Sequence, residues 1–227
     1  MYEMVTAVID EHYRRGRPDN SMAYIVGGYV DLTTKDKDYN YCVRDYKKNT
    51  RLYMRYEEIS FADTINESYI KAIHRYATAS NRLKAAGLRP VFATIPPSCL
   101  STWNYYRLNH GHTDFLLHHT QYEDMTEGLI QAVVKINGFI CKLNALHDVH
   151  TPYLAGTVVR TNAARGRQPV LQWHKYFDGV HADDLLIEEW AMKIKKSIDR
   201  NRTKDHFEPL TQYSAKYLAH LLEEIHI

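Results

Sequence analysis

The sequence has little of several features that would assign a function directly. Its formal net charge is only +2 over 227 residues, which excludes strong electrostatic attraction to nucleic acid or to an anionic membrane. Its three cysteines, Cys42, Cys99 and Cys141, fit neither a disulfide framework nor a zinc spacing. No apolar run approaches the ~20 residues that a membrane span needs, and no basic segment followed by an apolar core marks a signal peptide. These absences predict an intracellular protein, cytoplasmic or nuclear, with no membrane span.

What the sequence does have is an alternation of helical and strand patterns. Apolar residues at helical spacing predict helices over residues 3–15, 61–86, 123–146, 184–197 and 210–225. Short apolar runs bounded by glycine or proline predict buried strands over 22–26 and 90–95, and a weaker strand over 153–159. Residues 33–52 are expected to be a long loop or lid, residues 98–118 a loop or a short helix, and residues 160–167 a basic loop. Gly87 stands where a left-handed cap would end the second helix.

This order of elements predicts the fold class and the domain organisation. Helices that alternate with buried strands are typical of an α/β protein with a parallel sheet. We expect one α/β domain over residues 1–200 and a C-terminal helical extension over residues 201–227.

The candidate chemistry lies in the stretch Asp178-Gly179-Val180-His181, at the mouth of a predicted helix. An aspartate can hold a histidine ring in one tautomer, and the histidine can then activate a serine hydroxyl near neutral pH. No partner serine is evident. Ser98 is the nearest candidate because it follows a predicted strand, where ligands bind in open parallel sheets. The structural alternative is that Asp178 caps the helix beginning near His181–Asp184.

The Asp178–His181 stretch, with Trp190-Ala191 downstream, resembles the last sequence block of the SGNH (GDSL-type) hydrolases. Two earlier stretches resemble the family's Gly-x-Asn-Asp block (residues 24–31) and the strand that follows it (residues 92–97). The resemblance spans residues 3–200, and it is nearest to the SGNH-like domains of eukaryotic retroelements. It implies a three-layer α/β/α sandwich of the flavodoxin-like kind. It also implies a catalytic pair of Asp178 and His181, a small acyl ester as substrate, and neither a cofactor nor a metal.

The sequence departs from the family pattern in its N-terminal part. The Gly-Asp-Ser block that carries the nucleophile has no match upstream of Gly27-Gly28. Gly28 and Val30 fall at the pocket, and Val30 replaces the asparagine that donates a hydrogen bond to the oxyanion. Loss of one such donor typically costs about 10²–10³ in turnover. Asp31 is expected to be a structural anchor. The N-terminal strand is therefore expected to be missing and the chain truncated, with low or no esterase activity.

A non-enzymatic function is the alternative: a degenerate hydrolase fold that serves as a binding or assembly module in a mobile-element protein. The missing strand would leave the 22–26 strand with an unpaired edge, through which copies could self-associate. A small basic cluster (Arg160, Arg165 and Arg167) predicts at most weak, salt-dependent nucleic-acid binding.

The remaining histidines and the tryptophans have simpler interpretations. A histidine-rich stretch (His110, His112, His118 and His119) matches no zinc spacing and is interpreted as a polar loop. The three tryptophans (Trp103, Trp173 and Trp190) are expected to pack rather than to form a stacking surface.

Overall fold

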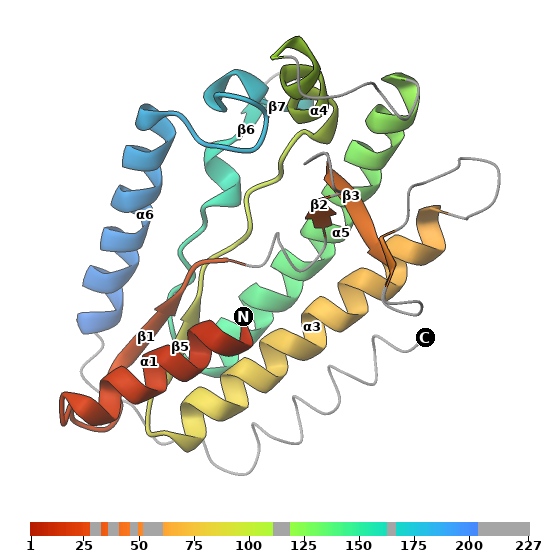
Figure 1. The fold of residues 1–227 in the computed structure, drawn as a ribbon. Helices are drawn as coiled ribbons and strands as arrows, with labels where there is room; N and C mark the ends of the chain where they lie inside the picture. Colours follow the sequence, from red (N-terminus) through yellow and green to blue (C-terminus); the bar gives the residue numbers. More distant parts are fainter. Residues whose placement is uncertain are drawn as a thin grey trace.

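Helices and short strands alternate along the chain in the computed structural model, which describes residues 1–27, 33–35, 41–45, 50–51, 61–110, 119–162 and 167–203. The helices are α1 (Tyr2–Arg14), α3 (Phe61–Ala85), α4 (Leu100–Asn109), α5 (His119–Leu146) and α6 (Asp184–Arg202), with the 3-10 helices η1 (Ala155–Thr157) and η3 (Trp173–Lys175). The strands are β1 (Met22–Ile25), β2 (Thr33–Lys35), β3 (Tyr41–Asp45), β4 (Thr50–Arg51), β5 (Arg89–Phe92), β6 (Val159–Asn162) and β7 (Arg167–Leu171). Figure 1 shows this arrangement, a mixed α/β fold.

Strands β1 and β5 form a two-stranded parallel sheet, in register from Met22↔Arg89 to Ile25↔Phe92. A parallel pair needs a crossover connection, and helix α3 lies between these strands in the sequence. The strands predicted at 22–26 and 90–95 are thereby confirmed in position. The second is shorter than expected, since β5 ends at Phe92 instead of residue 95.

Asparagine side chains from α5 take the place of a further strand beside β5. The N–H groups of Arg89 and Ala93 donate to Ser21, just before β1, and to Ile25 in β1. The N–H and C=O of Phe92 therefore point the other way. There the Asn144 amide accepts from the Phe92 N–H (2.9 Å) and donates to its C=O (2.6 Å). Asn137, two turns earlier in α5, accepts from the Ile95 N–H (2.7 Å) and donates to the Ile95 C=O (2.8 Å). These bonds satisfy buried backbone groups that would otherwise need another strand.

The core lies where α1, α3 and α5 meet one face of the β1–β5 pair. Apolar side chains recur at helical spacing along α3 and α5 and are buried there, as the sequence pattern predicts. The members of this cluster in α5 are Leu129, Ala132, Val133, Ile136, Phe139, Ile140 and Leu143.

The two faces of β1 meet different helices. Ala23 and Ile25 belong to the core cluster with α3 and α5. Successive side chains of a strand point to opposite faces, so Tyr24 points away from that cluster. Its hydroxyl accepts a hydrogen bond from Asn201 near the end of α6 (2.8 Å).

Helix α3 ends at the glycine that the sequence indicates. Gly87 has a φ of +75°, a conformation that glycine adopts without steric cost. The N–H of Leu88 donates to Leu83 (2.9 Å) and that of Gly87 to Lys84 (2.9 Å), which is the hydrogen-bond pair of a Schellman motif.

Three predictions for irregular or strand segments are wrong. The strand predicted over 153–159 does not form: the chain adopts η1, and only Val159 is in a strand, at the start of β6. The asparagines of α5 already hold the Phe92 and Ile95 backbone beside β5. The stretch 160–167 is not simply a loop, because β6 and β7 pair as an antiparallel ladder. Within 33–52, β2, β3 and β4 form an antiparallel sheet, and threonine, tyrosine and valine there favour strands.

One helix segment bears on the expectation that the chain has no membrane span. In the described part of the chain, the segment Gly128–Leu146 of α5 is long and apolar enough to cross a membrane. Half of that segment is buried inside the protein, as in the core helix of a globular domain. It is therefore weak evidence for a span. The predicted helix over 210–225 lies outside the described residues.

Candidate functional site

The stretch Asp178–His181 lies between η3 and α6, at the end of the molecule where α4 also lies (Figure 1). Both β5 and the segment that follows it run toward this end, so the stretch lies beyond the carboxyl end of the strand. Ligands of open parallel sheets bind at that edge.

Asp178 and His181 form the pair that the sequence predicts. The Nδ1 of His181 lies 2.6 Å from Oδ2 of Asp178. The other carboxylate oxygen accepts the backbone N–H groups of Val180 (2.9 Å) and His181 (2.8 Å). The carboxylate oxygen accepts in this contact, so Nδ1 donates, and the tautomer of the imidazole that this bond favours has its lone pair on Nε2. Asp178 is 4% exposed, whereas the imidazole is 61% exposed. A buried carboxylate thus orients an accessible base.

The N-cap residue of α6 is Asp183. A helix cap was the alternative interpretation of Asp178. The Asp183 side chain accepts from the N–H of Leu186 (2.7 Å) at the first turn of α6, as an N-cap residue does. Asp178 bonds only within its own turn among the described residues. The helix-cap interpretation of Asp178 is therefore excluded.

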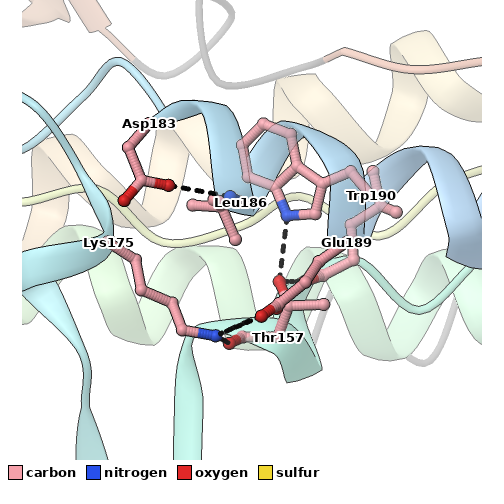
Figure 2. A network of polar contacts seen from close by, with 7 residues as sticks. Thr157, Lys175, Asp183, Leu186, Glu189 and Trp190 are labelled. Atoms are coloured by element: carbon pink, nitrogen blue, oxygen red, sulfur yellow. Dashed lines mark hydrogen bonds and ion pairs between the residues drawn. The ribbon is translucent and has the colours of Figure 1, made fainter.

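Partly buried polar contacts fix α6 against the segment that carries the site (Figure 2). Lys175 donates to the carbonyl of Thr157 (2.8 Å) and to both carboxylate oxygens of Glu189 (3.0 and 2.9 Å). The Trp190 indole N–H donates to the Thr157 hydroxyl (2.9 Å). Together with the Asp183 cap, these bonds hold both ends of the Asp178–His181 stretch.

The stretch is also joined to the segment that follows β5. The Tyr176 hydroxyl donates to the carbonyl of Pro97, and burial raises the pKa of that hydroxyl. The N–H of Cys99 donates to the carbonyl of Gly179 (2.8 Å). Gly179 has a φ of +91°, and a Cβ there would lie 2.6 Å from the Cys99 carbonyl oxygen. Only glycine fits this close approach without movement of the backbone.

Ser98 lies in the same region but does not complete a triad. It is 6% exposed, and no hydrogen bond joins it to His181. Across the described ranges, no residue is hydrogen-bonded to Nε2 of His181. The geometry therefore brings together the predicted base and its orienting acid, without the predicted nucleophile.

Three further predicted site residues, Gly28, Val30 and Asp31, lie outside the described residues. The preceding glycine, Gly27, is described, and its carbonyl accepts a hydrogen bond from the Tyr76 hydroxyl of α3. This contact ties the end of β1 to the core helix.

The other candidate residues have structural surroundings where they are described. Trp103 is buried, and Trp190 bonds to Thr157, so both pack as expected. His110 stacks on Tyr106 (ring centroids 4.1 Å apart) and its Nδ1 donates to the Tyr106 carbonyl (2.8 Å). Within the ranges that the structure covers, no three His, Cys, Asp or Glu side chains gather as a metal site. Arg160 and Arg167 lie in β6 and β7; His112, His118 and Arg165 lie outside the described residues.

The sequence did not indicate the aromatic contacts around the site. The Trp103 ring lies 5.2 Å from the His181 ring, and Tyr106 lies 5.4 Å from Phe177. The only available signal was the three-residue spacing of Trp103 and Tyr106, which places both on one side of α4. That Phe177 and His181 meet this side depends on tertiary structure.

Comparison of the chain with protein-family models, with curated proteins and with solved structures finds no match.

Proposed function

We propose that this chain is an SGNH-like acyl-ester hydrolase domain in which His181 is the general base and Asp178 orients it. The observation that carries the proposal is the 2.6 Å bond from Nδ1 of an exposed imidazole to a buried carboxylate. This is the base half of a Ser-His-Asp constellation. A purely structural histidine would need no such oriented and accessible ring.

The pair supports ester cleavage in a simple sequence of proton transfers. The oxygen of the attacking hydroxyl group bonds to the ester carbonyl carbon, and Nε2 of His181 takes the proton of that hydroxyl group. The C–O bond to the alcohol then breaks, and the imidazolium returns the proton to the leaving oxygen. Water supplies the hydroxyl overall, so the products are a carboxylic acid and an alcohol. Asp178 stabilises the imidazolium that forms between these steps.

The fold that we propose for this function is the three-layer α/β/α sandwich. It is supported by the parallel β1–β5 pair and by helical contacts on both faces of β1, through Ile25 to the core cluster and through Tyr24 to α6. The Asp178–His181 stretch lies between the last described strand and α6, in the order that the SGNH resemblance implies.

A second candidate is a catalytically degenerate domain that serves as a binding or assembly module. Two observations favour it: Ser98 does not bond to His181, and valine stands at position 30. Among the described strands, only β5 pairs with β1. An unpaired edge of β1 would suit self-association.

Hydrolysis of p-nitrophenyl acetate by the wild-type chain, His181→Ala and Asp178→Asn tests the proposal. The side-chain amide in Asp178→Asn can still accept backbone N–H groups but cannot fix the Nδ1–H tautomer, so we expect a folded protein with turnover reduced up to about 10⁴-fold. His174→Ala is the matched control, because His174 is an exposed histidine of η3 seven residues away. Equal rates for wild type and His181→Ala would remove the catalytic proposal and leave the module.

A further inference from the structure

Several aromatic side chains lie beside the candidate base. Phe177, adjacent to Asp178, is 70% exposed. Its ring packs edge-on against Tyr106 of α4, and Tyr106 in turn stacks on His110. On the same helix, one turn earlier, Trp103 contacts the ring of His181. We call these five side chains the ring row.

The ring row is held in place by the backbone around it. The N–H of Phe177 donates to the carbonyl of His181 (2.8 Å), which closes the turn. Tyr176 and Ala182 form a β-bridge across its base. The exposed phenyl ring thus projects from a fixed segment, and its exposure is not the fraying of a loose loop.

An exposed aromatic ring that adjoins a half-buried one carries more information than a single exposed apolar residue, because a contiguous apolar patch usually marks a binding surface. The exposed Phe177 ring is accessible to a ligand, and the half-buried Tyr106 adjoins it. Aromatic rings prefer aromatic partners at centroid distances of about 4.5–7 Å. Because the Phe177 N–H bonds to the His181 carbonyl, a small ring placed on Phe177 would lie beside the turn that carries the imidazole.

From this juxtaposition we propose that the site takes small esters that carry an aromatic ring, with the ring on Phe177 and Tyr106 and the ester beside His181. The inference rests on the proposed function and deepens it by naming the substrate class. Trp103, 6% exposed, packs against the imidazole, with the two ring centroids 5.2 Å apart.

The first test compares benzyl acetate with ethyl acetate in wild type, Phe177→Ala and Tyr13→Ala. Tyr13 is an exposed aromatic residue of α1, outside the site. Stacking of one ring predicts a KM for benzyl acetate about two- to tenfold below that for ethyl acetate. Phe177→Ala should remove this difference between the two esters, while Tyr13→Ala should retain it. Equal KM values for the two esters in active wild type overturn the inference and leave the proposed function intact.

The second test measures binding without turnover, by saturation-transfer NMR with benzyl alcohol. We expect transfer to the phenyl protons in wild type and Tyr13→Ala, and its loss in Phe177→Ala. Binding of this kind together with no hydrolysis of either ester supports the ring site and removes the hydrolase proposal. Equal transfer in Phe177→Ala, or transfer to a single-stranded oligonucleotide in place of benzyl alcohol, overturns the inference.

Discussion

Asn144 offers the sharpest test of how this fold is stabilised. Its side chain is fully buried, and it accepts from the Phe92 N–H, donates to the Phe92 C=O and donates to the Thr151 hydroxyl (3.0 Å). Truncation to alanine leaves the two backbone groups of the buried Phe92 without partners. Each such group costs about 1–3 kcal/mol, so we expect Asn144→Ala to lower the free energy of unfolding by about 2–6 kcal/mol.

The measurement is urea unfolding, with the midpoint compared at unchanged m-value. Asn144→Leu separates the lost hydrogen bonds from the cavity, because leucine nearly restores the volume but restores no polar contact. It should therefore remain destabilised by at least about 2 kcal/mol. Lys142→Ala, on an exposed position of the same helix, should stay within about 0.5 kcal/mol of wild type. If Asn144→Leu is as stable as Lys142→Ala, the amide does not substitute for a neighbouring strand.

Three further predictions concern pH, the tight turn and the helix cap. Burial, with a smaller effect of Lys84, lowers the pKa of His147 from 6.5 to about 4. Between pH 4 and pH 6.5 this histidine therefore binds more protons in the unfolded chain than in the folded chain. Stability falls by about 3 kcal/mol as the pH drops from 7 to 4, and urea titrations should show this loss reduced in His147→Gln; an identical pH profile would contradict it. Gly179→Ala should cost about 1–3 kcal/mol because of its positive φ and the nearby Cys99 carbonyl. Gly138→Ala, in an open helical position, should instead stabilise by about 0.5–1 kcal/mol, so thermal melting must move the two variants in opposite directions. Asp183→Ala should lower the free energy of unfolding by about 1 kcal/mol through loss of the N-cap bond, and an unchanged denaturation midpoint would argue against that cap.

The parts of the fold that local patterns predict are those whose stability is local. The helical spacing along 123–146 and the glycine at position 87 depend on neighbours within one or two turns, and the structure has both the helix and its cap. The strand over 153–159 was predicted by the same reasoning and is wrong. Whether an apolar run becomes a strand depends on a free edge beside it, and Asn137 and Asn144 already occupy the edge of β5.

In the candidate site, too, the contacts within one turn could be predicted from the sequence and the contacts between distant residues could not. Asp178 and His181 are three residues apart, so their pairing is a property of one turn and could be expected from the sequence. The sequence alone also determined the mixed α/β class and its parallel β1–β5 pair, through its alternation of apolar helices and strands. Only the tertiary structure brought Gly179 against Cys99, Phe177 against Tyr106 and His181 against Trp103. These contacts join positions about 70 to 80 residues apart, and their geometry is set by how α4 packs against the turn at residues 177–181, which no local spacing encodes.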